Sequence, residues 1–337
     1  MSQITKALTL NDLPAPPPGK VGWPWTEGSD PLPKKMPDGS DWPRISIVTP
    51  SYNQGQFIEE TIRSVLLQGY PGLEYIVVDG DSADETVEII KKYERALHFW
   101  ISEPDQGQAD ALNKGFIHAT GEICAYLNSD DWLLPDTLHK VARAFREQKC
   151  RWLASQVYVG ESLESAQNWN PGNKNRFESF VAQQCFAQQG VFWRIDVLER
   201  PYFDTMWEYI LDHDFFSRIF EKNNAPYILD ELTAWFRLHP LSKTTLLDNI
   251  LNDERKKLAQ LVIQRSPSDV ATRIKKECQR RYNVVQSNNL LDTYPHQFSE
   301  KIRALQKSLK LLVDDPYPWR DRIFWSATTR LILRLLS

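Results

Sequence analysis

Apolar residues between positions 44 and 150 follow two alternating spacings. Over 57–66 and 108–119 they recur every three or four positions, which is typical of helices that bury one face. Short runs rich in β-branched and aromatic residues lie between such segments and predict strands at Ile45–Thr49, Leu73–Val78, His98–Ser102 and Glu122–Leu127. Strands that alternate with helices predict an α/β fold of three layers around a mainly parallel sheet.

Each predicted strand is followed by a polar loop. These loops cover 50–54, 79–84, 103–108 and 128–131. Ligands of open α/β sheets bind at the carboxyl ends of the strands, so we expect the four loops to converge on one site. In the second loop, Ser82 to Glu85 has the spacing of a capping box and predicts that a helix begins there.

The two ends of the chain differ from this central pattern. Residues 1–43 hold nine of the 21 prolines, and they predict an extended arm that is either pinned by Trp23 and Trp25 or a loose linker. Beyond 150 the pattern loosens, with strands predicted at Val191–Arg194 and within Tyr227–Arg237 and a helix at Tyr209–Glu221. We therefore predict an arm over 1–43, an α/β domain over 44–240 and a helical region over 241–337.

Composition narrows the class of protein. The 337 residues are 25% charged with a formal net charge of −4, which is ordinary for a globular protein and argues against a nucleic-acid partner. Four cysteines without a C-x-x-C pair argue against a zinc site and fit a reducing cytosol. The start lacks a signal pattern, and no uninterrupted apolar run reaches about 18 residues. The sequence thus predicts a cytoplasmic protein without a membrane-spanning segment.

Carboxylates at the end of the fourth strand are the strongest chemical feature. Asn128-Ser129-Asp130-Asp131 directly follows an apolar run, and adjacent carboxylates there need a cation or hydrogen-bond donors. Oxygen ligands favour Mg²⁺ or Mn²⁺ over zinc. The alternative is a turn in which Asp131 caps the next helix. Asp79, after the second strand, could bind a base or ribose, or could also be a cap.

Further candidates lie in the second half of the chain. Asp212 begins an aromatic helix and is either a general base or a carboxylate favoured by the helix dipole. His239 is either a metal or phosphate ligand or a packing residue. Walker A, G-x-G-x-x-G, H-E-x-x-H and G-x-S-x-G motifs do not occur, so a phosphate-bearing substrate would lack a glycine cradle and would need a metal in this acidic site.

Several motifs together resemble one family. The segments IVTPSYNQGQFIEETIRSVLLQ, YIVVDGDSADET, DQGQADALNKG, LNSDDW and LDHDFFSRI are similar, in order and spacing, to those of inverting family 2 glycosyltransferases with the GT-A fold. The resemblance covers roughly residues 44–240, and agreement among several motifs makes it more specific than any one of them.

The resemblance implies roles for individual residues. On the nucleotide-sugar side, the matching positions are Pro50, Tyr52, Asn53, Glu59, Asp79, Ser82, Asp84, Gln108, Asp110, Asn113, Lys114, Asn128, Ser129 and Asp130. Among these, Asp79 matches the carboxylate that reads the base, and Asn128 replaces the first aspartate of the D-x-D motif. The implied metal ligands are Asp130, Asp131 as neighbour or co-ligand, and His239. Asp212 matches the catalytic base, although Leu211 replaces the acid before it. Gln188 and Gln189 match the segment beside the acceptor.

The implied reaction is metal-dependent, inverting transfer of a sugar from a nucleotide-diphospho-sugar to a hydroxyl of a glycan or lipid-linked acceptor. The family-level expectation is cell-surface polysaccharide or glycolipid assembly. Two alternatives stay open. A sugar nucleotidyltransferase usually needs a basic glycine-rich loop near its first strand, which PSYNQGQ does not provide, and a non-catalytic nucleotide-sugar-binding relative would not be expected to keep these carboxylates.

The last segment, 319–337, interleaves tryptophans and leucines with four arginines against one aspartate, a net charge of +3. This is the chemistry of an interfacial amphipathic helix, which would bring the enzyme to the inner face of the plasma membrane. The alternative is a helix packed on its own domain or on a homodimer partner.

Overall fold

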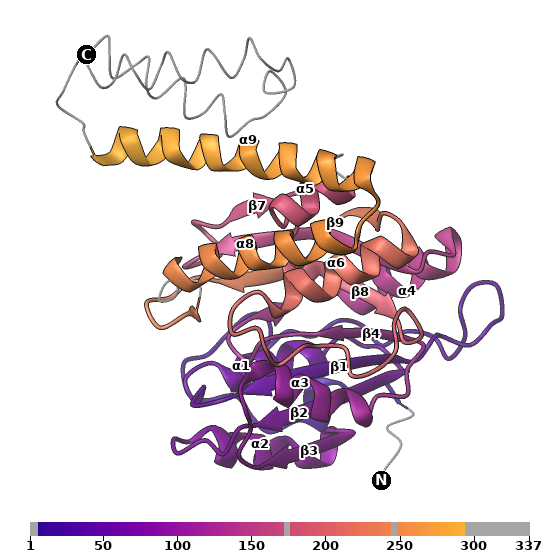
Figure 1. The fold of residues 1–337 in the computed structure, drawn as a ribbon. Coiled ribbons are helices and arrows are strands. Elements are labelled where there is room, and N and C mark those ends of the chain that lie inside the picture. The colour runs from indigo at the N-terminus through magenta and orange to yellow at the C-terminus, as the bar shows by residue number, and fades with distance from the viewer. Residues whose placement is uncertain (1–5, 172–175, 244–247, 294–337) are drawn as a thin grey trace. The chain divides into compact units, whose positions relative to one another are not determined.

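The computed structural model describes residues 6–171, 176–243 and 248–293 (Figure 1). The chain divides into two compact units, 1–258 and 259–337. The first unit therefore includes the proline-rich arm and extends past residue 240.

The first four strands along the chain form the parallel half of the central sheet. Its strands are β1 (Ile45–Ser51), β2 (Leu73–Asp79), β3 (Phe99–Ser102) and β4 (Ile123–Tyr126), in the spatial order β3-β2-β1-β4. Ile45 pairs with Leu73 on one side and Ile123 on the other, so the strands end at nearly the same level. Every residue of β1 and β2 is buried, as expected for strands covered on both faces.

Three helices connect these strands: α1 (Ile58–Leu66), α2 (Thr86–Tyr93) and α3 (Gln108–Ile117). They confirm the predicted alternation of strands and helices. The start of α2 differs from the prediction, because the capping box does not form. Ser82 instead donates its hydroxyl to Asp79, and the helix begins at Thr86, whose backbone N–H donates to Asp84 at 3.0 Å.

The second half of the sheet is mixed rather than parallel. It contains β5 (Trp132–Leu133), β6 (Trp152–Gly160), β7 (Gln167–Trp169), β8 (Val191–Arg194) and β9 (Tyr227–Arg237). β8 lies antiparallel to both β4 and β6, β9 runs parallel to β6 and antiparallel to β5, and β7 pairs with β6. The expectation of a mainly parallel sheet thus holds for the first half only, and β6 was not predicted.

Aromatic side chains pack beside this mixed half. The helices here are α4 (Thr137–Gln148), α5 (Phe177–Ala182) and α6 (Leu211–Asn223). Trp152 and Trp193 are fully buried, and both contact Phe216 of α6. Burial of large rings contributes strongly to stability, and it fixes α6, which begins with the sequence Leu211-Asp212, against the sheet.

The proline-rich arm packs against α1. Arg63 of α1 is fully buried, and its guanidinium donates hydrogen bonds to the carbonyls of Pro14 (2.8 Å), Pro24 (3.0 Å) and Trp25 (2.9 Å). The Trp23 indole donates to the Leu133 carbonyl at 2.9 Å. The arm is therefore pinned to the domain, which was one of its two predicted alternatives, and is not a loose linker.

The second unit contains the end of α8 (Asp248–Arg265) and α9 (Ser268–Thr293). None of the helices in the described ranges is long and apolar enough to cross a membrane. The basic segment 319–337 lies outside the described residues.

Candidate active site

A cavity of about 670 Å³ opens at the carboxyl ends of the parallel strands. Its wall is formed by the loops after β1, β2, β3 and β4 and by residues beyond β9, namely Pro50, Ser51, Tyr52, Gln54, Gly80, Asp81, Pro104, Asp105, Gly107, Gln108, Ala111, Asn128, Ser129, Asp130, Leu241 and Lys243. The four predicted loops therefore meet at one site. Six of the predicted residues line it: Pro50, Tyr52, Gln108, Asn128, Ser129 and Asp130.

The loops after β1 and β2 hold each other in place. Asn53 has a left-handed backbone (φ 52°), its N–H donates to the Ser82 hydroxyl at 2.7 Å, and its side-chain oxygen accepts from the Ala83 N–H at 2.9 Å. Asp84 accepts from the Gly55 N–H at 2.9 Å. Asn53, Ser82 and Asp84 thus shape the cavity wall from behind.

Asp79 lies beneath the wall. It is fully buried, and its carboxylate accepts hydrogen bonds from the Ser82 N–H (2.9 Å), the Ser82 hydroxyl (2.5 Å) and the Ser102 hydroxyl (2.7 Å). The residues after it, Gly80 and Asp81, line the cavity instead. A Cβ on Gly80 would lie 2.6 Å from a side-chain oxygen of Asp105, so a larger residue there would require the Asp105 side chain to move.

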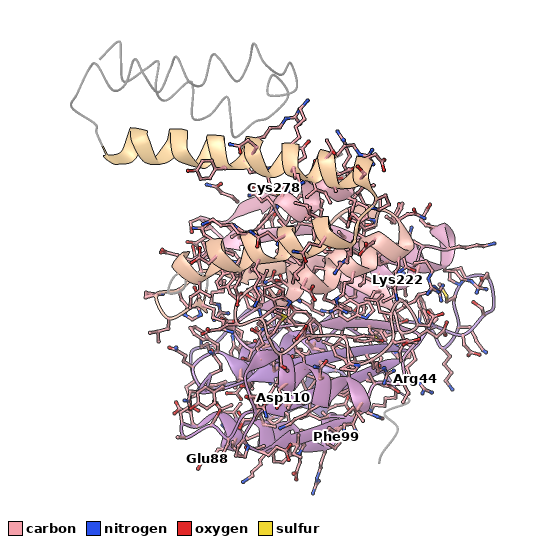
Figure 2. The ribbon with its side chains drawn as sticks, viewed as in Figure 1. Arg44, Glu88, Phe99, Asp110, Lys222 and Cys278 are labelled. Atoms are coloured by element: carbon pink, nitrogen blue, oxygen red, sulfur yellow. The ribbon has the colours of Figure 1, made fainter. Side chains whose placement is uncertain are left out.

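Of the predicted residues on helix α3, Gln108 lines the cavity, whereas Asp110, Asn113 and Lys114 lie outside its lining. Gln108 Nε2 donates to Asn128 Oδ1 at 2.7 Å, which links the loops after β3 and β4. Asn113 exchanges two hydrogen bonds with the backbone of Phe203, at 2.7 and 3.0 Å. Lys114 pairs with Glu103 at 2.9 Å and with Asp110 at 3.5 Å. Asp110 is labelled on α3 in Figure 2.

Glu59 lies on α1, outside the cavity lining, where it accepts a hydrogen bond from the Tyr93 hydroxyl at 2.9 Å. The same hydroxyl accepts one from Arg63 at 3.1 Å. Glu59 is therefore part of the network that holds the arm.

Asp130 lines the cavity and pairs with His239, which lies outside the lining. Asp130 Oδ2 lies 3.0 Å from His239 Nε2, and the Asp130 side chain is 19% exposed. The His239 ring packs on Phe57, with ring centroids 4.5 Å apart. The strand β4 and the end of β9 thus bring together two residues that are 109 positions apart.

Asp131 points away from the cavity. It is fully buried, its Oδ1 accepts from the Arg237 N–H at 3.0 Å, and its Oδ2 accepts from Gln189 Nε2 at 2.7 Å. Burial raises the pKa of Asp131 well above its usual value, and the negative charge of Asp130 raises it further. The neighbouring Gln188 donates to the Tyr126 carbonyl at 2.6 Å.

Asp212 lies in the first turn of α6. Its Oδ1 accepts from the His213 N–H at 2.8 Å and its Oδ2 from Gln184 Nε2 at 2.9 Å. Burial raises the pKa of Asp212 above its usual value, which these hydrogen bonds partly offset. Burial also raises the pKa of Tyr126, with further increases from the nearby charges of Asp212 and Asp131. Tyr126 of β4 thus lies close to both carboxylates.

The residues present fit a divalent ion. Within the described ranges, no cluster of three or more histidine, cysteine, aspartate or glutamate side chains could hold a metal alone. Asp130 and His239 supply one carboxylate and one imidazole, and Mg²⁺ is commonly bound through one or two carboxylates together with substrate phosphates. Both Asp131 oxygens already accept hydrogen bonds, so Asp130 is the better placed carboxylate.

Five polar or charged residues of the wall were not predicted from the sequence: Ser51, Gln54, Asp81, Asp105 and Lys243. The first four belong to loops that were expected to converge, although they were not singled out. Lys243 follows β9, and nothing in the local sequence marks it as a cavity residue.

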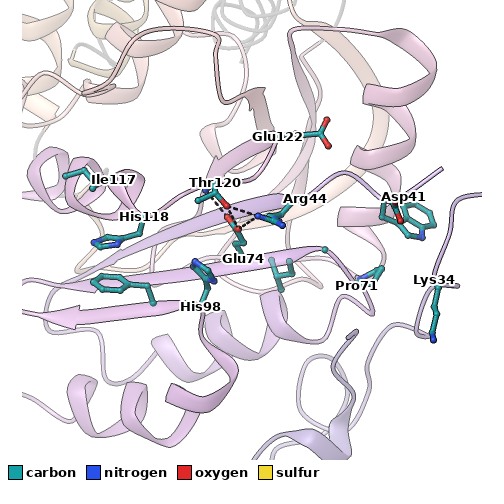
Figure 3. Close-up of a pocket in the computed structure, with 14 residues that line it drawn as sticks. Lys34, Asp41, Arg44, Pro71, Glu74, His98, Ile117, His118, Thr120 and Glu122 are labelled. Carbon is teal, nitrogen blue, oxygen red and sulfur yellow. Dashed lines mark hydrogen bonds and ion pairs between the residues drawn. The ribbon is translucent and has the colours of Figure 1, made fainter. Parts of the chain in front are cut away.

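A second cavity, of about 900 Å³, lies at the opposite, amino ends of β1 and β2 (Figure 3). Glu74 on its wall accepts four hydrogen bonds, from the Ser46 hydroxyl (2.6 Å), the Thr120 N–H (2.9 Å), the Thr120 hydroxyl (2.5 Å) and Arg44 (3.2 Å). Although this cavity is larger, none of the predicted site residues lines it, so the carboxyl-end cavity is the candidate active site.

Comparison with known proteins identifies the class. Residues 46–194 match the family model Glycosyl transferase family 2, so the chain carries a family 2 glycosyltransferase domain. It is 37% identical over 139 residues to the teichuronic acid biosynthesis glycosyltransferase TuaG of Bacillus subtilis, a match that covers 40% of this chain and 53% of TuaG. Against the poly(ribitol-phosphate) β-N-acetylglucosaminyltransferase TarS of Staphylococcus aureus it is 32% identical over 110 residues, covering 31% of this chain and 19% of TarS. The chain spans about half the length, or less, of the curated relatives it matches.

Solved structures show the same fold. TarS residues 1–349 in complex with UDP-GlcNAc align with a TM-score of 0.61 at 18% identity, covering 87% of this chain and 89% of that chain. A mannosyltransferase from Pyrobaculum calidifontis in complex with GDP-Man and Mn²⁺ aligns with a TM-score of 0.53 at 18% identity, covering 93% of this chain and 88% of that chain. The fold is therefore GT-A, as the resemblance implied.

Proposed function

We propose that this protein transfers a sugar from a nucleotide-diphospho-sugar to an acceptor hydroxyl, with inversion at the anomeric carbon. The observation that carries the proposal is Asp130, which lines a cavity at the carboxyl ends of parallel strands within a family 2 domain and pairs with His239. The neighbours whose structures are in complex with UDP-GlcNAc and with GDP-Man and Mn²⁺ support a nucleotide sugar as the donor class.

The protein's own residues would act on two sides of the donor. On one side, Asp130 and His239 would hold Mg²⁺ or Mn²⁺, which as a Lewis acid supplies positive charge to the diphosphate. On the other side, Asp212 would accept the proton of the acceptor hydroxyl. Its hydrogen bonds with Gln184 and His213 fix the carboxylate in place, and its raised pKa makes it a stronger base than an exposed aspartate.

The remaining predicted residues are likewise divided between the donor side and the acceptor side. Tyr52, Gln108 and Asn128 line the cavity and would contact the donor directly. Asp79 would read the base, although it is fully buried and its carboxylate already accepts three hydrogen bonds. Gln188 and Gln189 would border the acceptor while they hold Tyr126 and Asp131.

The acceptor class follows from the relatives. TuaG and TarS are named for the cell-surface polymers teichuronic acid and poly(ribitol-phosphate), so we infer a cell-surface polysaccharide or glycolipid acceptor. Such an enzyme would work on the cytoplasmic side of the membrane. The segment 319–337 would then bind the membrane, and its removal would abolish sedimentation with anionic liposomes. Unchanged sedimentation would favour packing on the protein or on a second copy instead.

A panel of UDP-, GDP- and dTDP-sugars tests the proposal through release of nucleoside diphosphate with and without Mn²⁺. We expect one donor to be hydrolysed only with the metal, and Asp130→Ala to remove that activity while thermal unfolding stays normal. Release of pyrophosphate from a nucleoside triphosphate and sugar phosphate would indicate a nucleotidyltransferase instead. Binding without turnover, with every acceptor tested, would indicate a non-catalytic relative.

A further inference from the structure

The carboxyl-end cavity has an unbalanced charge. Three carboxylates line it, those of Asp81, Asp105 and Asp130, and among the described lining residues Lys243 is the one cation. A diphosphate that enters such a cavity meets net negative charge, which opposes binding. A single divalent ion at Asp130 would offset only part of this repulsion. The positive charge of Lys243 would therefore favour the binding of any anionic ligand.

Lys243 is anchored to a fixed turn. Its ammonium donates a hydrogen bond to the Glu208 carbonyl at 2.7 Å. That turn is itself held by Glu254 of α8, whose carboxylate accepts from the N–H groups of Glu208 (2.8 Å), Tyr209 (2.9 Å) and Ile210 (3.1 Å). Because α6 begins at Leu211, the same turn positions both Lys243 and Asp212.

The ammonium retains capacity to bind an anion. An ammonium has three N–H donors, and within the described part of the chain only the Glu208 carbonyl accepts one of them. The side chain is exposed at the cavity, yet surrounding protein removes part of its hydration. This burial lowers the pKa of Lys243, while the charges of Glu208, Glu254 and Asp212 oppose the shift. A partly dehydrated cation attracts an anion more strongly than one in bulk water.

We propose that Lys243 binds the diphosphate of the donor and stabilises the negative charge that forms on the leaving group. This inference rests on the proposed function and adds a residue to it. When the bond between C1 and the β-phosphate oxygen breaks, its electron pair stays on that oxygen, beside Lys243. The acceptor oxygen forms the new bond to C1, and its proton passes to Asp212.

A lysine in this role separates diphosphates from monophosphates. A nucleoside monophosphate lacks the β-phosphate, so it gains little from Lys243, whereas a nucleoside diphosphate gains a charged hydrogen bond. Charged hydrogen bonds contribute about 1.5–3 kcal/mol, which corresponds to roughly a tenfold to hundredfold difference in affinity. Removal of the charge should therefore weaken the binding of diphosphate selectively.

The test compares Lys243→Met with Lys243→Arg and with Lys222→Met, a matched change at an exposed lysine of α6 that lies outside the cavity lining (Figure 2). Titration calorimetry measures UDP and UMP binding, or the GDP or dTDP pair if the donor screen selects that base, at saturating Mn²⁺. We expect Lys243→Met to lose about tenfold to a hundredfold in affinity for the diphosphate and to keep its affinity for the monophosphate. Lys243→Arg should restore most of the loss, and Lys222→Met should match the wild type.

Two results would overturn the inference while the proposed function stands: unchanged diphosphate affinity in Lys243→Met, or equal losses for diphosphate and monophosphate, which would indicate a purely structural role. Turnover adds a second readout, since a leaving-group contact lowers kcat as well as affinity, and an unchanged kcat would also contradict it. A wild-type protein that binds no nucleotide at all would instead refute the proposed function, and this inference with it.

Discussion

The parallel half of the sheet and the mixed half contribute different parts of the candidate site. In the parallel half, the loops after β1, β2, β3 and β4 bring residues to the cavity because parallel strands end at the same level. In the mixed half, Asp212 and His239 are placed by contacts between distant segments. Gln184 and Asp212 are 28 positions apart, and Asp130 and His239 are 109.

This difference separates donor binding from catalysis. The loops of the parallel half form most of the cavity wall, and their residues also bind one another, as Gln108 does Asn128. The mixed half supplies the proposed base, the histidine beside Asp130 and the cation Lys243. Changes in the donor loops of the first half should therefore alter mainly donor affinity. Changes in the second half should alter turnover, and at Lys243 they should alter diphosphate affinity as well.

The largest effect is expected for Asp212→Asn. Loss of a general base lowers kcat by roughly 10²–10⁴-fold, while nucleotide binding should be unchanged. Steady-state transfer assays and nucleotide titrations measure the two quantities. Asp253→Asn, at an exposed aspartate of α8 that pairs with Lys256, is the matched control and should keep full activity. A variant at Asp212 with full activity would remove it from the mechanism.

The same carboxylate predicts a pH profile. The pKa of Asp212 is raised by burial, and only its ionised form can accept a proton. The value of kcat/KM should therefore fall as pH decreases through this raised pKa, so the acid limb should lie above the ordinary aspartate value of about 3.9. An acid limb at or below that value would contradict the assignment.

The next largest effect concerns stability, and it tests the packing of the arm against α1 beside the parallel half. Arg63→Met removes the buried guanidinium and leaves the carbonyls of Pro14, Pro24 and Trp25 without their donor. We expect the free energy of unfolding to fall by about 3 kcal/mol or more, measured by urea denaturation. Arg146→Met is the control, because Arg146 also contacts the arm, at Asp38, but through an exposed ion pair. It should change stability little.

Low pH should reduce the free energy of unfolding through His213, which is buried beside the mixed half. Its ring is buried, with Nε2 2.7 Å from the Phe180 carbonyl, and burial lowers its pKa to about 3 from a usual value of 6.5. The unfolded chain therefore binds a proton that the folded chain excludes, and stability falls as pH drops below 6.5. At pH 4.5 the loss is about 2–3 kcal/mol relative to pH 8. His213→Gln should lack this component, and an identical pH dependence of its unfolding would count against it.

The smallest effect is expected in the donor loops. Gln108→Ala removes the hydrogen bond to Asn128 and should raise the KM for donor about fivefold, equivalent to about 1 kcal/mol, with kcat unchanged. Gln56→Ala, at an exposed glutamine after β1, should leave both constants unchanged. A change in kcat with an unchanged KM would remove the distinction between a binding half and a catalytic half.

Predictions from sequence succeeded where local pattern and topology coincide. The runs at Ile45–Thr49 and Leu73–Val78 became β1 and β2, and the loops that follow them meet as expected. The capping box at Ser82 failed because the Asp79 carboxylate, brought close by the loop, competes for the Ser82 hydroxyl. Strand β6 was missed because its first four residues are all buried, so that no regular alternation of apolar and polar positions marks its start.

By itself, the sequence determined the order of strands and helices in the first half, the acidic loops after the strands and the family to which residues 46–194 belong. Periodicity and motif spacing carry this information because they reflect contacts close along the chain. Only the tertiary structure decided that Asp131 is enclosed by Gln189 and Arg237, that Asp130 faces His239, and that Lys243 reaches the cavity. These contacts join segments far apart in the chain, and they form only when the mixed half of the sheet closes against the parallel half.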